Sequence, residues 1–71
     1  MNERKKGEII IYKDLKGYGF VRDESMHDEF FHFSDCKGFT PTTGDSVIYD
    51  IGTDRQGRTK AINIERKEEI E

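Results

Sequence analysis

Five short segments rich in β-branched and aromatic residues, each followed by a turn, most constrain how this chain can fold. They span residues 8–12, 18–23, 29–34, 46–52 and 59–65. Such residues favour strands, whereas the stretches between them are rich in glycine, aspartate, lysine and threonine and include the only proline. No stretch of useful length has apolar residues at helical spacing. The pattern predicts an all-β fold in which five antiparallel strands close into a small barrel.

The chain is long enough for one domain only. It has 71 residues, of which 32% are hydrophobic and 38% are charged. A domain of this size buries only about 60% of the surface that its unfolded chain exposes. We expect a flexible head at residues 1–6, one folded domain at residues 7–65 and a charged, frayed tail at residues 66–71. With so few apolar side chains available, aromatic rings placed on the surface would be lost to the core.

Net charge and cysteine content bear on location more than on function. The formal net charge is −3, and the last seven residues, with four acids and two bases, carry most of it. A nearly neutral domain can still have a positive face. The single cysteine, Cys36, cannot form an internal disulfide and suits a reducing compartment. No apolar run approaches the length of a membrane helix or a signal-peptide core, so we expect a cytoplasmic protein without a membrane partner.

Two aromatic clusters, KGYGFV at residues 16–21 and FFHF at residues 30–33, lie on neighbouring predicted strands. Side chains alternate between the two faces of a strand, so we expect Val21 and Phe31 to point into the core. The residues that then share the outer face are Tyr18, Phe20, Phe30 and His32. The opposite assignment would bury His32, which is costly unless its ring nitrogens are hydrogen-bonded. A core in two layers, filled by some of these rings, is the alternative.

Alternation also predicts faces on the two C-terminal strands. The residues expected to share a face are Val47, Tyr49 and Ile51 on the fourth strand, and Ile62 and Ile64 on the fifth. Phe33 lies at the end of the third strand, where alternation often fails, so its side is left open.

An exposed patch of flat rings needs a physical reason, and nucleobases are ligands that such rings can stack on. Each stacked base contributes roughly 1–3 kcal/mol. In a duplex the base faces are already stacked on each other, so a single strand is the better partner. Lys13 and Lys16 flank the first aromatic cluster and can contact phosphates.

The order and spacing of KGYGFV and FFHF resemble the two ribonucleoprotein motifs of the cold-shock domain, a five-stranded OB-fold barrel that binds single-stranded RNA and DNA. The resemblance extends over about residues 7–65 and includes GDSVIYDI and GRTKAINI near the end of the chain. It implies an OB-fold and a set of binding residues. Those that match are Tyr18, Phe20, Phe30, His32, Phe33 and Phe39 at base-stacking positions, Lys16 as a backbone contact and Asp28 as an acceptor for a base edge. Lys13 and Arg58 complete the candidate site.

Departures from the family pattern bear on binding strength. The first strand has Ile10 and Ile11 where the family usually has a basic residue and a tryptophan, and Ile11 cannot stack. Loss of one ring, at roughly 1–3 kcal/mol per base, would weaken binding by one to two decades. Glu29 replaces an apolar residue, whereas Lys13 replaces a typical asparagine and adds positive charge. The proline usual before the last strand is absent, and Arg58 lies near its place.

Two other binding modules were compared with this pattern. An RRM domain is excluded because it needs a strand and a helix ahead of its KGYGFV-type motif, and only fifteen residues precede Lys16. An OB-fold protein–protein interaction module with weak or lost nucleic-acid binding is the alternative function. Ile10, Ile11 and Ile48 would be its contact patch, which could also drive weak self-association of an otherwise monomeric protein.

An enzyme is not expected. His27, Asp28, His32 and Cys36 do not have the paired short spacing of a zinc site, and they form no recognisable set of nucleophile, base and acid. We therefore predict no catalytic residue, metal, cofactor or small-molecule substrate. The predicted function is binding of single-stranded RNA or DNA, in RNA chaperoning or in the regulation of transcription or translation.

Overall fold

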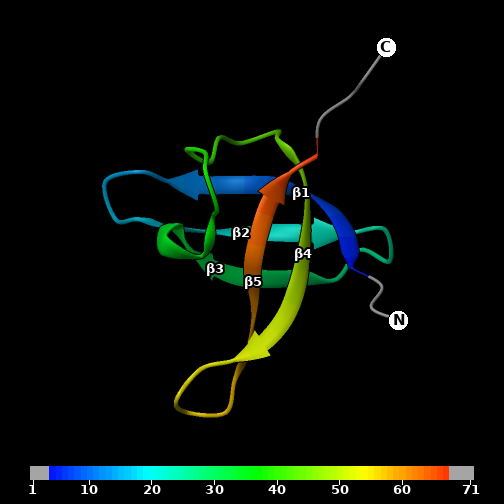
Figure 1. Cartoon of the computed structure of the whole chain (residues 1–71), viewed down its shortest axis with the longest axis vertical. Coiled ribbons are helices and arrows are strands. Elements are labelled where there is room, and N and C mark those ends of the chain that lie inside the picture. The colour runs from blue at the N-terminus through cyan, green and yellow to red at the C-terminus, as the bar shows by residue number, and fades with distance from the viewer. Residues whose placement is uncertain (1–3, 68–71) are drawn as a thin grey trace.

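The computed structural model describes residues 4–67, which form five strands (Figure 1). The elements are β1 (Lys5–Lys13), β2 (Tyr18–Asp23), β3 (Asp28–His32), a 3-10 turn η1 (Phe33–Asp35), β4 (Ser46–Thr53) and β5 (Thr59–Arg66). Neighbouring strands are antiparallel and follow the order β3–β2–β1–β4–β5. The predicted all-β fold of five antiparallel strands is confirmed. In the part of the chain that the structure describes, no helix is long and apolar enough to cross a membrane.

The predicted strand limits differ from the observed ones mainly near the two ends of the chain. β1 begins at Lys5 because its first two residues pair with β4, whereas the sequence predicts a flexible head through residue 6. β5 extends through Arg66, which pairs with β4 and which the sequence places in the tail. The rest of the predicted head and tail, residues 1–3 and 68–71, lies outside the described residues.

The strands form two layers that cross. β1, β2 and β3 lie in one layer, and β4 and β5 run across it (Figure 1). The edge strands β3 and β5 then face each other without a continuous backbone ladder among the described residues. Thr59 Oγ1 donates to Glu29 Oε1 at 3.1 Å, and one isolated bridge joins Cys36 to Ile64. The barrel is therefore partly open, and one side-chain hydrogen bond and one isolated backbone bridge stand where a ladder would otherwise close it.

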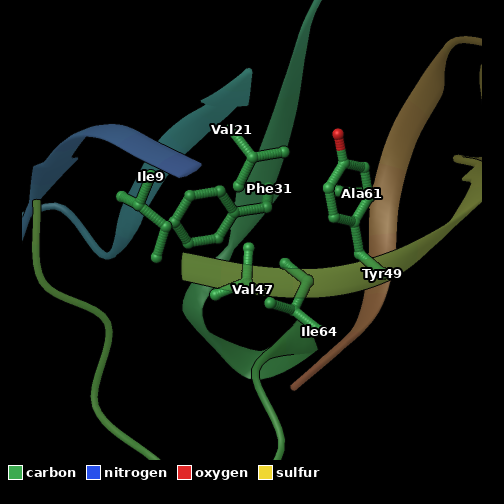
Figure 2. Packing of buried hydrophobic residues seen from close by; sticks show 7 residues of the cluster. All are labelled: Ile9, Val21, Phe31, Val47, Tyr49, Ala61 and Ile64. Carbon is green, nitrogen blue, oxygen red and sulfur yellow. The ribbon is translucent and has the colours of Figure 1, made fainter. Parts of the chain in front are cut away.

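The core between the two layers consists of fully buried apolar side chains. They are Ile9, Val21, Phe31, Val47, Tyr49, Ala61 and Ile64. Figure 2 shows the side chains of the first layer meeting those of β4 and β5. The inward positions predicted for Val21 and Phe31 are confirmed.

The prediction that Ile62 and Ile64 share a face of β5 is wrong. Ala61 and Ile64 are fully buried, whereas Ile62 is only half-buried. Asn63, which lies between Ile62 and Ile64, has φ 52°, in the left-handed region. β5 has one extra residue at this point in its pairing with β4. Such a bulge changes which side chains point inward, and alternation cannot anticipate it. On β4, Ile51 is 37% exposed, although the sequence places it on the side of the two buried residues.

Candidate nucleic-acid interface

Six side chains on the outer face of β1, β2 and β3 form two rows, which we call the platform. One row consists of Lys13, Tyr18 and His32, and the other of Ile11, Phe20 and Phe30. Residues directly opposite each other on antiparallel strands point to the same face of the sheet. The register therefore brings together the four rings that alternation predicts on the outer face.

Three of the four rings of the platform pack against one another, and all four remain accessible. The centroids of Tyr18 and Phe30 are 5.6 Å apart with the planes tilted by 36°, and those of Phe20 and Phe30 are 5.9 Å apart, edge to face at 74°. Phe30 is 38% exposed, and the other three rings are half-buried. None belongs to the buried core, so the outward placement is confirmed and the alternative of a core in two layers is not observed.

Ile11 reaches the platform because β1 has a bulge. Ile9 pairs with Val21 and Ile11 pairs with Phe20, so Ile10 is an extra residue between them. Ile9 is fully buried, whereas Ile11 is 39% exposed. No glycine or proline marks the bulge, and sequence alternation could not locate it. The position at which the resembling family has tryptophan thus lies on the platform, where isoleucine adds apolar area but no ring.

Two glycines of the KGYGFV segment, Gly19 in β2 and Gly17 in the turn before it, make room for neighbouring rings. A Cβ atom at Gly19 would lie 2.3 Å from the carbonyl oxygen of Ile11 and 3.0 Å from the ring of Phe31. Gly17 has φ 78°, and a Cβ atom there would lie 2.9 Å from Cδ2 of Phe33. The inner ring of Phe31 and the exposed ring of Phe33 can therefore approach the backbone only where it lacks side chains.

Phe33 lies beyond the end of β3, so the predicted third strand is two residues too long. The strand ends at His32, whose Nδ1 accepts a hydrogen bond from the backbone N–H of Ser34 at 3.1 Å and caps η1. The ring of Phe33 is 52% exposed, and its centroid is 4.9 Å from that of His32. It therefore extends the platform past the His32 end.

Phe39 has a different environment from the other predicted stacking residues. Its ring is half-buried and packs against the core, and the guanidinium carbon of Arg66 lies 5.5 Å from its centroid. Within residues 4–67 it is not paired with another aromatic ring. The structure thus places Phe39 apart from the platform, and its role in binding stays a prediction.

The predicted cationic side chains differ in whether they already form ion pairs within the protein. Lys13 and Lys16 are exposed, and neither forms an ion pair with another residue that the structure describes. Lys16 lines a cleft of about 360 Å³ together with Phe33. Arg58 lies on the β4–β5 hairpin, and its Nε atom is 3.3 Å from Oδ2 of Asp54. Together with Phe30 it lines a cleft of about 230 Å³. The lysines are therefore better placed than Arg58 to neutralise phosphate charge.

Asp28, the predicted acceptor for a base edge, is already paired. Arg22 donates from Nε to Oδ1 of Asp28 at 2.7 Å and from Nη2 to Oδ2 at 3.2 Å. The hydrogen bond from Arg22 is the main reason that the pKa of Asp28 lies below its ordinary value. This pair was not predicted from the sequence, although Arg22 follows Phe20 by two residues and so shares its face.

The structure gives no support for a metal or thiol site. In residues 4–67, no group of three histidine, cysteine, aspartate or glutamate side chains is placed to hold a metal ion. Burial, with a smaller contribution from Asp35 and Asp45, raises the pKa of Cys36 to about 11. Its thiol is therefore protonated at neutral pH and is a poor nucleophile.

Comparison with known proteins agrees with this geometry. The family described as the 'Cold-shock' DNA-binding domain matches residues 5–67. Glycine-rich protein 2 of Nicotiana sylvestris and Cold shock domain-containing protein 4 of Arabidopsis thaliana are each 33% identical to this chain, in alignments of 66 residues that cover 87% of it. The major cold shock protein CspA of Pseudomonas aeruginosa is 40% identical over 38 residues, which are 54% of this chain and 55% of that protein.

A solved structure shows the same fold. Drosophila Unr CSD456 superposes with a TM-score of 0.75 and 27% sequence identity over 94% of this chain and 28% of that one. The matched region spans only 31% and 33% of the two plant relatives. The family is one of nucleic-acid-binding domains and is not an enzyme family. A match over residues 5–67, with the two aromatic motifs on adjacent strands of a five-stranded sheet, shows that this chain belongs to the cold-shock domain family.

Proposed function

We propose that this protein binds single-stranded RNA or DNA by stacking bases on the platform, and that it acts as an ATP-independent RNA chaperone. The observation that supports the proposal most directly is the platform itself, in which four rings lie on one exposed face of β2 and β3. Lys13 on the platform and Lys16 beside it supply positive charge for the phosphates.

The spacing of the rows favours an extended single strand over a duplex. Outward-facing residues on a strand recur every second position, so the two rows lie about 7 Å apart. Stacked bases in a duplex follow one another at about 3.4 Å per strand. Rings at twice that spacing fit bases that have been separated from each other, which a duplex cannot offer without melting.

The proposed chaperone mechanism follows from this preference. Bases that open transiently in a weak RNA duplex would stack on the rings, and each captured base would contribute roughly 1–3 kcal/mol against reclosing. Sequence preference should be slight because every base has a face that can stack. Since Ile11 supplies no ring, we expect weaker binding than a platform with tryptophan at that position would give.

The direct test is fluorescence anisotropy with a labelled oligonucleotide, single-stranded or annealed, at two salt concentrations. We expect clear preference for the single strand and a shallow dependence on salt, because few phosphates are contacted. Replacing Phe30 with alanine should weaken single-strand binding roughly 10- to 100-fold, since one stacking ring is lost. The fluorescence of a weak RNA hairpin labelled at both ends should report opening by the protein without ATP.

Ile51→Ala is the matched control for Phe30→Ala. Ile51 is 37% exposed, against 38% for Phe30, but it lies on β4, outside the strands that form the platform. We expect its removal to leave affinity unchanged. Equal affinity of the folded Phe30→Ala variant and the wild type would contradict base stacking. Absence of binding even at low salt would instead favour the alternative function of a protein–protein interaction module.

A cytoplasmic location is part of the proposal. It rests on the single cysteine, Cys36, which suits a reducing compartment. Imaging of the tagged protein in its own cells would test it.

A further inference from the structure

The outer face of β2 and β3 continues beyond the two rows of the platform. Arg22 lies directly opposite Asp28 of β3 and Glu8 of β1, in register with the two rows of the platform. Because directly opposed side chains share a face and outward positions recur every second residue, these three residues form a third row about 7 Å beyond the second. The side chains of Arg22 and Asp28 are 40% and 39% exposed, so both are accessible to a ligand.

The contact between Arg22 and Asp28 holds the guanidinium in a defined orientation. It is bidentate, with Nε donating to Oδ1 at 2.7 Å and Nη2 to Oδ2 at 3.2 Å. A two-point contact of this kind fixes the plane of the guanidinium as well as its position. The ammonium group of a lysine in the same place would have no flat surface on which another group could stack.

The charges in and around the third row do not attract a phosphate. Arg22 borders a groove of about 470 Å³ whose lining includes the carboxylates of Glu8, Asp23 and Glu24. The other cations of that lining are Lys6 and Lys67, and Lys5 close by is 3.5 Å from Asp23. With Arg22 paired to Asp28 and Lys5 paired to Asp23, the remaining acids Glu8 and Glu24 balance the remaining lysines, so the groove has no net positive charge. A neutral, flat group fits this setting better than an anion does.

We propose that Arg22, held by Asp28, is a third stacking position that takes the nucleobase following the two on the platform. This inference rests on the proposed function, because it adds one subsite to the same single-strand track. Unstacked bases can pack on the planes of arginine side chains as well as on aromatic rings. Arg22 has five donors and Asp28 occupies two of them, so the other donors remain available for the edge of the base or the sugar.

The test uses oligothymidylates lengthened by one nucleotide at a time, with anisotropy as the measurement. For the wild type, affinity should rise by a step as each subsite is filled. One step, roughly tenfold, should disappear in Arg22→Ala and equally in Arg22→Lys, because lysine keeps the charge but has no plane. Arg55→Lys on the exposed β4–β5 hairpin is the matched control and should retain every step.

A second measurement separates a base contact from a phosphate contact. An abasic nucleotide, which keeps its phosphate, is moved along the oligonucleotide in the wild type and in Arg22→Lys. We expect the abasic nucleotide to cost roughly tenfold at the third subsite in the wild type and to cost nothing there in the variant. Wild-type affinity and an unchanged abasic profile in Arg22→Lys would overturn the third subsite while leaving the platform intact. If the wild type binds no single strand at all, the proposed function fails, and the third subsite fails with it.

Discussion

The two faces of β2 and β3 carry rings of the same kind with opposite environments. Phe31 is fully buried among the core residues, whereas Phe30, its neighbour in the chain, is 38% exposed and contacts the rings of Tyr18 and Phe20. Composition cannot distinguish them, since both are phenylalanine in the same strand. The alternation of the strand and the pairing with β2 assign one to stability and the other to the proposed stacking of bases.

The difference also shows what each face needs from β2. The inner face requires Gly19, because a Cβ atom there would lie 2.3 Å from the carbonyl oxygen of Ile11 and 3.0 Å from the ring of Phe31. The outer face has large residues in register, so that its rings lie beside one another. A substitution on one face should therefore change stability without changing the binding surface, and the reverse should hold on the other face.

The largest expected effect is on the inner face. Replacing Phe31 with alanine should lower the free energy of unfolding by about 3–5 kcal/mol, because it removes a buried ring and leaves a cavity. A chain of this size has a total stability of about 4–11 kcal/mol, so the variant can unfold altogether. Urea denaturation followed by circular dichroism measures the change.

Phe31→Leu keeps the prediction testable if the alanine variant does not fold. Leucine retains most of the buried apolar area, so we expect a smaller loss in the same direction. Phe30→Ala is the matched substitution on the outer face and should change the unfolding free energy much less. Equal losses for Phe30→Ala and Phe31→Ala would mean that the two faces are not separated as the exposures indicate.

The next effect is a gain on the outer face. Ile11→Trp places a ring opposite Phe20, at a position that is 39% exposed, so it should enlarge the platform with little strain. One additional stacked base, at roughly 1–3 kcal/mol, should tighten single-strand binding by about one to two decades. The chain has no other tryptophan, so quenching of its fluorescence by the oligonucleotide reports the contact directly.

Ile51→Trp is the control for this gain, because it adds an exposed ring on β4, away from the platform. It should leave affinity unchanged. Tighter binding by both variants would show that added aromatic area anywhere suffices. Unchanged affinity of Ile11→Trp would show that the bases do not pass over the first strand.

Much of this comparison could be predicted from the sequence. Strand order along the chain, the inward positions of Val21 and Phe31 and the outward rings all follow from local residue types and a period of two. The strand ends that border the turns between strands are likewise near the predicted positions, because glycine and aspartate mark those turns.

The remainder depends on irregularities that have no local signal. The bulge at Ile10 puts Ile11 on the platform, and the left-handed residue Asn63 puts Ala61 and Ile64 on the same face of β5. Phe39 lies apart from the other rings because its loop folds against the core and Arg66, which are tertiary contacts. Spacing along the chain cannot reveal contacts of that kind.

The smallest predicted effect concerns Tyr49, whose ring is fully buried on the inner side of β4. Its Oη atom is buried and has no hydrogen-bond partner among the residues that the structure describes. Burial, with a smaller contribution from Asp23, Glu29 and Asp28, raises the pKa of Tyr49 to about 12. This value lies above the pKa of tyrosine in the unfolded chain, about 10. The stability that depends on the neutral phenol of Tyr49 is therefore fully present below pH 10 and is lost as the pH rises through about 12.

Tyr49→Phe isolates this contribution from the other groups that titrate in alkali. Phenylalanine keeps the buried ring and removes a hydroxyl that makes no hydrogen bond, so we expect equal or slightly greater stability at pH 7. At about pH 11 the variant should gain a further 1 kcal/mol or so over the wild type, since it has no phenol to ionise. Urea denaturation at the two pH values measures both quantities. A variant less stable at pH 7 would mean that the hydroxyl has a partner, such as a buried water. An advantage that does not grow with pH would mean that Tyr49 has the same pKa in the folded and unfolded chains.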